Sequence, residues 1–378
     1  MRPHLLVMLI AFLGLAGCAM DGTNPLQPDE EEDAAAPDPG GGGEGIPGDG
    51  VDQEGGIGGV GLPPGTDNPR PNNDLRRVEE RNDEGGGLAR DFRYDVATDT
   101  FSVDNLAFDG FNEYRRSGQE GVSETFFAGS TKGGTASSGT LGGYAVYEAD
   151  IAVTDFLDGS QVGQALPYRA IFGVSEFTAV NDAGETVPRS AFAIVRTGGY
   201  TDYGFGGFIY ERSGAVILPP DNFRGQAVFQ GEYAGMRVFE GRSGMEFTRG
   251  DVTVQLDFLD FNDNDGVAVF VRNREAFDSA GNPIDPDALP LPVLTSVVRV
   301  GVDSPSASGE ITGDIGSTRV NETGVAEEYE TGKYYGILSG DITSGDGGEI
   351  VGIFVVESED PRFENVNAQE TGGFIVYR

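Results

Sequence analysis

Apolar and polar side chains alternate with a period of two through most of the chain after residue 88. In the segment DVTVQLDF, residues 251–258, every second residue is apolar: Val252, Val254, Leu256 and Phe258. A period of two places alternate side chains on opposite faces of a strand, whereas a helical face would need a period near 3.6. No stretch longer than about a dozen residues keeps a helical face. The pattern therefore predicts an all-β fold.

From Gly225 onward, short apolar or aromatic runs recur at the spacing typical of sandwiches and barrels. The first two runs are Ala227–Gly231 and Gly235–Phe239, and Phe374–Tyr377 closes the chain. The run Ile350–Val356 is apolar at nearly every position, which indicates a strand covered on both faces. About 290 residues exceed one ordinary domain, so we expect two β modules, 89–220 and 221–378.

The first 18 residues read as an export signal. Arg2 precedes an apolar run that is too short to span a bilayer, and the segment ends Leu-Ala-Gly-Cys at Cys18. This ending resembles the lipobox of bacterial lipoproteins, which implies lipidation of Cys18, including palmitate, and an acylated first mature residue. Because Ala19 follows, the resemblance implies the outer membrane. The alternative is an ordinary signal peptide with a chance cysteine.

Residues 19–88 are rich in Gly, Pro and acidic side chains, and no aromatic residue occurs between Phe12 and Phe92. Such a segment buries too little apolar area to offset its chain entropy, so we predict a disordered tether. Within it, residues 74–83 (DLRRVEERND) fit a short helix with Leu75 and Val78 on one side. A helix of that length is marginal without packing.

Two counts limit the chemistry. The only histidine, His4, and the only cysteine, Cys18, both lie in the first 18 residues. A mature chain that starts at Cys18 has no histidine, which excludes Ser–His–Asp and Cys–His catalysis and histidine-ligated metals or haem. Carboxylate chemistry, hard-cation binding and tyrosine ligation remain possible for such a chain. We predict no enzyme activity, no resident metal and no cofactor. The net charge of −37 repels nucleic acid.

Several segments together resemble one family. They are the lipobox, the Gly- and acid-rich leader, Gly225–Tyr233 (GQAVFQGEY), Tyr334–Gly336 (YYG) and Glu349–Phe354 (EIVGIF). This combination resembles the transferrin-binding protein B-like surface lipoproteins, and in particular single-lobe, solute-binding β-barrel members. Residues 337–348 interrupt the signature, and one lobe is present where the transferrin receptors have two.

The resemblance implies a handle-like β module over 89–220, an antiparallel eight-stranded β-barrel over 221–378, and anchorage at the cell outer membrane. It also implies a non-catalytic binding role for a solute or a partner protein, with iron or haem acquisition and a TonB-dependent transporter as the associated system. Whether the protein faces the periplasm or the cell surface stays open. Two alternatives also remain: a structural envelope or coat lipoprotein without a dedicated ligand, and a carboxylate-dependent hydrolase.

Two local clusters are candidate sites. Tyr200, Tyr203 and Phe205 lie in a Gly-rich segment and are candidate contacts for a ligand or partner. Their alternative role is aromatic packing at strand ends. Oxygen ligands alternate before Gly266, and the weak calcium candidates are Asp260, Asn262, Asp263 and Asp265. The spacing departs from an EF-hand, and Asn-Asp-Gly between two strands also fits a hairpin turn.

Overall fold

The computed structural model describes residues 61–378, apart from 84, 96–97, 99, 105–111, 117–143, 150–151, 155–158, 164–167, 200–201, 221–222, 259–265, 300–304, 322 and 345–346. Every regular element in the described part of the chain is a β-strand. The predicted all-β fold is therefore confirmed. Within these residues, no helix has the length and apolar character needed to cross a membrane.

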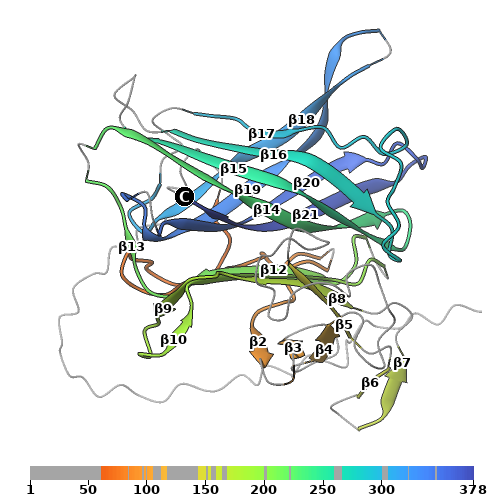
Figure 1. Cartoon of the computed structure of the whole chain (residues 1–378). Coiled ribbons are helices and arrows are strands. Elements are labelled where there is room, and N and C mark those ends of the chain that lie inside the picture. Colours follow the sequence, from red (N-terminus) through yellow and green to blue (C-terminus); the bar gives the residue numbers. More distant parts are fainter. Residues whose placement is uncertain are drawn as a thin grey trace, which may run out of the picture. The chain divides into compact units, whose positions relative to one another are not determined.

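Eight strands form a closed antiparallel barrel, because β19 pairs with both β18 and β20 (Figure 1). This confirms the predicted eight-stranded barrel. The barrel strands are β14 (Gly225–Glu240), β15 (Met245–Phe258), β16 (Gly266–Phe277), β17 (Leu294–Ser296), β18 (Glu310–Val320), β19 (Ala326–Asp341), β20 (Glu349–Glu359) and β21 (Asn367–Tyr377). The two-residue strand β13 (Val216–Ile217) runs parallel to the end of β19.

The sequence predicts two strands where the structure has one. β14 runs without a break from Gly231, where the first predicted segment ends, to Gly235, where the second begins. A β-carbon at Gly231 would lie 2.6 Å from the carbonyl oxygen of Ile375. Glycine here permits a close approach to the neighbouring strand β21 and does not mark a turn.

The barrel interior is apolar towards one end and charged towards the other. Alternate residues of β15, including Val252, Val254 and Leu256, point inward and join an apolar cluster with Phe354 and Phe374. Towards the opposite end, the inward positions carry buried charged side chains that pair with one another, namely Arg237, Glu246, Arg274, Glu330, Asp360 and Glu370. Charges this deeply buried persist because each lies near an opposite charge.

A second, eight-stranded sheet, here called the handle sheet, has the order β1-β12-β11-β8-β5-β4-β3-β2. Its strands are β1 (Leu75–Val78), β2 (Phe92–Asp95), β3 (Thr100–Val103), β4 (Asn112–Arg116), β5 (Ala145–Ala149), β8 (Arg169–Val174), β11 (Ser190–Arg196) and β12 (Gly206–Arg212). Two small ribbons accompany it: β6 (Ala152–Thr154) with β7 (Gln161–Gly163), and β9 (Thr178–Val180) with β10 (Thr186–Pro188).

The handle sheet curls so that its two edges approach each other. Phe92 of edge strand β2 lies 5.4 Å from Phe172 of β8, ring centroid to centroid, although three strands separate β2 from β8 in the sheet. At the other edge, Arg76 of β1 pairs with Asp91, the residue before β2. The enclosed side chains form an apolar cluster that includes Phe101, Tyr147 and Ile209.

The opposite face of the handle sheet packs on the outside of the barrel. Phe192 and Ile194 of β11 join one buried cluster with Met236 of β14 and Ile353 of β20. A β-carbon at Gly373 would lie 2.3 Å from the Phe192 ring, so glycine at this position makes room for the ring. β20 is therefore covered on both sides, by the barrel interior and by the handle sheet, as its apolar sequence predicts.

Residues 61–88 correct the predicted extent of the tether. β1 is a strand, paired residue by residue with β12, and not the short helix that residues 74–83 were expected to fit. Leu75 and Arg77 of β1 are buried, and Arg77 forms an ion pair of 2.7 Å with Glu310 of the barrel. The sequence of this segment is too polar to fold alone, but the edge of β12 supplies its hydrogen bonds and the barrel supplies a partner for its charge.

Candidate functional site

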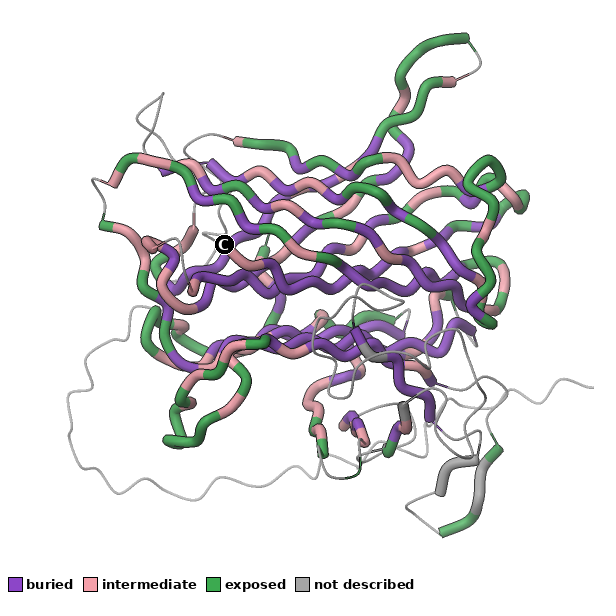
Figure 2. Tube along the Cα trace, viewed as in Figure 1, coloured by how far each residue is buried: buried purple, intermediate pink, exposed green. Residues whose placement is uncertain are grey.

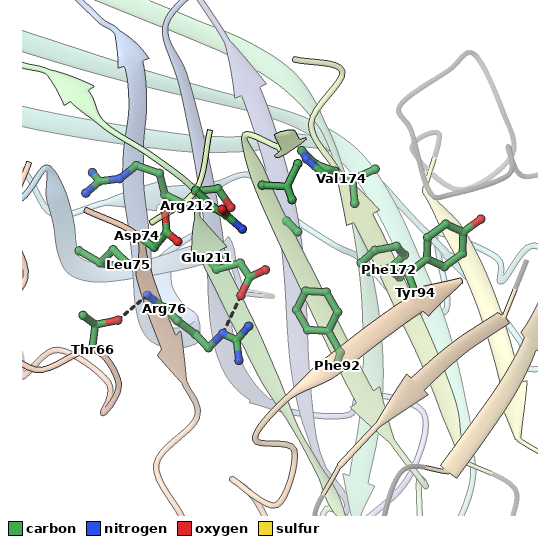
Figure 3. Close-up of a pocket in the computed structure, with 15 residues that line it drawn as sticks. Thr66, Asp74, Leu75, Arg76, Phe92, Tyr94, Phe172, Val174, Glu211 and Arg212 are labelled. Carbon is green, nitrogen blue, oxygen red and sulfur yellow. Dashed lines mark hydrogen bonds and ion pairs between the residues drawn. The ribbon is translucent and has the colours of Figure 1, made fainter. Parts of the chain in front are cut away.

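A cavity of about 490 Å³ lies on the face of the handle sheet that points away from the barrel, between the two approaching edges. We call it the outer-face pocket. Its walls come from strands β1, β2, β8, β10, β11 and β12 and from the segments beside them (Figure 3). The side chains that line it are Thr66, Asp74, Leu75, Arg76, Phe92, Tyr94, Phe172, Val174, Asn181, Val187, Pro188, Ala191, Glu211, Arg212 and Ser213.

One wall of the outer-face pocket carries a charged pair. Arg76 and Glu211 are direct cross-strand partners in the β1–β12 ladder. Arg76 Nε donates to Glu211 Oε2 at 2.6 Å, and Arg76 NH1 donates to Asp91 Oδ1 at 2.6 Å. The backbone N–H of Arg76 donates to Thr66 Oγ1 at 2.9 Å (Figure 3). One arginine thus joins both edges of the curled sheet and fixes the charged wall.

Burial and charge act in opposite directions on this pair. Burial disfavours the charged guanidinium of Arg76, but the neighbouring carboxylates Glu211 and Asp91 outweigh it and raise the pKa of Arg76. Burial raises the pKa of Glu211, and the charge of Arg76 offsets this only in part. Asp91 and Asp74 add like charge and raise it further. Arg76 therefore balances local negative charge, and it offers a bound anion little net attraction.

The facing wall is aromatic. Phe172 contacts Phe92 at 5.4 Å and Tyr94 at 5.3 Å between ring centroids, and Figure 3 shows the three rings side by side. The guanidinium of Arg76 lies 5.9 Å from the Phe92 ring centroid. Aromatic and aliphatic walls with a few placed polar groups are typical of sites for small molecules. The cavity volume also lies within the usual range of about 300–1,000 Å³.

The rim of the pocket is held by a reciprocal aspartate contact. Asp74 Oδ2 accepts the backbone N–H of Asp182 at 3.0 Å, and Asp182 Oδ2 accepts the N–H of Asp74 at 3.3 Å. Asp74 Oδ1 also accepts the N–H of Gly214 at 2.7 Å. These contacts tie the segment before β1 to the turn between β9 and β10, so the rim is built by residues far apart in the sequence.

The arrangement suits binding by shape and apolar contact. The described residues contain no group of three or more His, Cys, Asp or Glu side chains arranged to hold a metal ion. The charged groups of the wall, Arg76 and Glu211, already pair with each other. A ligand in this cavity would therefore gain most from burying apolar surface against the rings of the aromatic wall.

The structure places two of the predicted contact residues outside this pocket. Tyr203 is half-buried against the cluster between the handle sheet and the barrel. Phe205 is half-buried against the cluster inside the curled sheet, and its backbone N–H donates to Thr197 Oγ1 at 3.0 Å. Neither side chain lines the outer-face pocket. Tyr200 lies outside the described residues, as do Cys18 and the calcium candidates Asp260, Asn262, Asp263 and Asp265.

The residues of the pocket were not found from the sequence. Arg76 of its charged wall lies on β1, within a segment that composition assigns to the tether. The order Leu75-Arg76-Arg77-Val78 has no apolar–polar alternation, so it carries no local signal for a strand. The partner Glu211 lies 135 residues away, and no local pattern connects the two.

No family model and no curated protein matches this sequence. Two solved structures show a distant similarity to this chain. One is a double mutant of transferrin binding protein B from Haemophilus parasuis, with 11% identity, a TM-score of 0.27 and 76% of this chain covered. The other is HpuA from Kingella denitrificans in complex with human haemoglobin, with 12% identity, a TM-score of 0.27, and 82% of this chain and 89% of that chain covered.

This chain spans 65% of the transferrin binding protein B chain, which is less than two thirds of its length. The identity of 11–12% and the TM-score of 0.27 are low in both cases. This similarity transfers no ligand, partner or residue role to this protein.

Proposed function

We propose that this protein is an outer-membrane lipoprotein that binds a small, largely apolar solute, without catalysis, in the outer-face pocket. The observation that carries the proposal is a cavity of about 490 Å³ with the aromatic wall of Phe92, Tyr94 and Phe172. The charged pair Arg76–Glu211 would face the polar end of the solute. Burial of an aromatic ring against such a wall contributes by area and by edge-to-face contact.

The anchor and the transport system belong to the same proposal. The lipobox ending at Cys18 supports acylation at the outer membrane. The resemblance of Tyr334–Gly336 and Glu349–Phe354 to the transferrin-binding protein B-like signature supports a role in nutrient acquisition, with iron or haem as candidate cargo of the system. A TonB-dependent transporter is the proposed membrane partner.

Filling the pocket should weaken solute binding. Val187 of β10 lines the pocket, and Val187→Trp would place an indole in the cavity. Benzyl alcohol, benzylamine and benzoate share one aromatic body with three different polar ends, and they serve as probes in titration calorimetry. At least one should bind the wild-type protein. We expect Val187→Trp to weaken the binding of that probe about tenfold or more, or about 1.4 kcal/mol.

The matched control is Val180→Trp on the neighbouring strand β9. Val180 is 61% exposed and does not line the pocket, so this change should leave probe affinity unaltered. The pocket is not a solute site if none of the three probes binds the wild-type protein. The same conclusion follows if both tryptophan variants bind the probe with wild-type affinity. A structural envelope role would then be favoured.

Removal of the thiol should release the protein from the membrane. Cys18→Ser cannot form the thioether to diacylglycerol, so we expect the full chain to move to the soluble fraction and to lose labelling by radioactive palmitate. Met20→Ser, two residues on, keeps the thiol and should stay in the membrane fraction. A Cys18→Ser protein that still sediments with membranes would show that acylation is not the anchor.

A further inference from the structure

The hairpin between β18 and β19 extends beyond the barrel wall (Figure 1). β17 pairs with β18 only at Ile315 and Gly316, and β20 begins to pair with β19 at Thr331. Between these limits the two strands pair only with each other, from Thr318↔Glu328 to Val320↔Ala326. We call Thr318–Glu328 the β18–β19 ribbon. Among the described residues, no strand pairs with the outer edge of this ribbon on either side.

The direction of the backbone groups along this ribbon follows from its turn. The N–H of Asn321 donates to the carbonyl of Val325 at 2.9 Å, so these two residues form a hydrogen-bonded pair. Hydrogen-bonded and non-hydrogen-bonded pairs alternate along an antiparallel ladder. Val320↔Ala326 and Thr318↔Glu328 are therefore non-hydrogen-bonded pairs. Their N–H and C=O groups point outward, at Ala326 and Glu328 on the β19 edge and at Thr318 and Val320 on the β18 edge.

The side chains beside the β19 edge are apolar and acidic. Val320 is 71% exposed and lies opposite Ala326, so both are on one face of the ribbon, which also carries Glu328. Arg319 is neutralised by Glu327, with a contact of 2.8 Å, and its guanidinium lies 4.8 Å from the centroid of the Tyr329 ring. Glu328 is exposed and has no ion-pair partner among the described residues.

Natural edge strands usually carry charged side chains, especially lysine, or proline, a bulge or a covering segment that discourages strand addition. The β18–β19 ribbon has a register shift at its base, between Ser317 and Thr318, and the charged side chains on its two strands are the Arg319–Glu327 pair and Glu328. It contains no lysine and no proline, and Figure 2 shows it exposed along most of its length, so the protection that remains is acidic on the β19 side. A second copy of this chain is disfavoured as the occupant, because each copy carries a net charge of −37 and the β19 edges would bring Glu328 side chains together. An occupant with basic side chains would be attracted to the same edge.

We propose that the β19 edge of the β18–β19 ribbon binds an extended segment of a partner protein by strand addition, and that this segment alternates aliphatic and basic residues. Its backbone would pair with the outward N–H and C=O groups of Ala326 and Glu328. An aliphatic side chain would pack beside Val320 and Ala326, and a basic one would lie opposite Glu328. This interaction is independent of the outer-face pocket, which lies on the handle sheet.

A short, acetylated and amidated peptide of alternating valine and lysine is the test probe. Ala326→Pro removes one outward N–H from the β19 edge without removing a hydrogen bond of the ribbon or changing its charge. It should weaken peptide binding about tenfold or more, or about 1.4 kcal/mol. The matched variant Thr318→Pro removes an outward N–H from the β18 edge and should bind the peptide as the wild type does. Glu328→Gln should weaken binding and reduce its dependence on salt.

Hydrogen exchange gives a second measurement that needs no variant. Peptide addition to the wild-type protein should slow exchange of the amides of Ala326 and Glu328, while those of Arg319 and Glu327, already paired across the ribbon, should change little. The proposal is overturned if the wild type binds no peptide at low salt, if Ala326→Pro and Thr318→Pro behave alike, or if only Arg319 and Glu327 gain protection. Self-association that Ala326→Pro abolishes would identify a second copy as the occupant and would also overturn it.

Discussion

Replacing Arg212 with methionine should lower the free energy of unfolding by about 3–5 kcal/mol. Arg212 ends β12 and is 1% exposed. All five of its N–H donors reach backbone carbonyls, at distances from 2.8 to 3.1 Å. The acceptors are the carbonyls of Arg70, Asn73, Gly214, Ser308 and Leu338. Methionine has similar length but leaves these buried acceptors without their donor.

The five carbonyls belong to three parts of the fold, so the variant should also loosen their connection. Arg70 and Asn73 precede β1, and Gly214 follows β12. In the barrel, Ser308 precedes β18 and Leu338 lies in β19. Burial lowers the pKa of Arg212 to about 10, although the nearby acids Glu310, Asp74 and Asp182 oppose this. The guanidinium therefore remains charged at neutral pH. We expect proteolysis within residues 61–74 to be faster in Arg212→Met.

Guanidinium chloride unfolding measures the effect, and two variants control it. Arg212→Lys keeps the charge, but three ammonium protons cannot satisfy five carbonyls, so it should lose most of the same stability. Arg319→Met removes an exposed ion pair and should change stability by about 0–1 kcal/mol. A loss below about 1 kcal/mol in Arg212→Met would show that water replaces the guanidinium at these carbonyls.

Arg274→Met should have a comparable effect from inside the barrel, about 3–5 kcal/mol at neutral pH. The Arg274 side chain is fully buried and forms ion pairs of 2.7 Å with both Glu330 and Glu370. Arg274 NH1 also donates to the carbonyl of Pro292 at 2.9 Å. Without the arginine, two buried carboxylates face each other with no cation between them. Thermal unfolding at neutral pH, compared with the wild type, measures the loss.

The triple variant Arg274→Met, Glu330→Gln and Glu370→Gln separates charge from packing. Glu330 accepts a hydrogen bond from Ser317 at 2.6 Å, and Glu370 accepts one from Thr248 at 2.9 Å. Glutamine keeps an oxygen for each donor, so the triple variant should recover part of the stability lost in Arg274→Met. If it is less stable than Arg274→Met, unpaired charge is not the main cost of the single change.

The contribution of Glu330 to stability should change with pH in opposite directions in the wild type and in Arg274→Met. Burial alone would raise the pKa of Glu330, but the charge of Arg274 and hydrogen bonds from Arg274 and Ser317 outweigh burial and lower it below the ordinary 4.5. The contribution of Glu330 to wild-type stability is therefore complete when the pH is above its pKa in the unfolded chain. This contribution is lost as pH falls through the lower pKa of the folded state. In Arg274→Met the largest cause that lowers the pKa of Glu330 is absent, while Ser317 and Arg237 remain, so we expect this pKa to rise. The deficit relative to wild type should shrink as pH falls from neutral towards the ordinary carboxylate range.

The period of two predicted the fold class because strand alternation is a local property. Val252, Val254 and Leu256 point into the barrel as the alternation requires. Ile350–Val356 lies between two apolar surfaces, as its sequence indicates. The prediction failed between Gly231 and Gly235, where two separate strands were expected, since composition cannot distinguish a glycine that ends a strand from a glycine beside a neighbouring backbone. It also failed at β1, whose composition resembles a disordered segment and whose order comes from β12 and the barrel.

The all-β fold could be predicted from the sequence alone, because strand alternation depends on the order of neighbouring residues. The export signal that ends at Cys18 stays a prediction of the same local kind. The candidate site was decided only by the tertiary structure. The Arg76–Glu211 pair joins residues 135 positions apart, and Arg212 gathers carbonyls from segments up to 142 positions away. Such contacts depend on how the handle sheet curls and packs on the barrel. That geometry arises from the packing of many side chains together, and no short segment of the sequence specifies it.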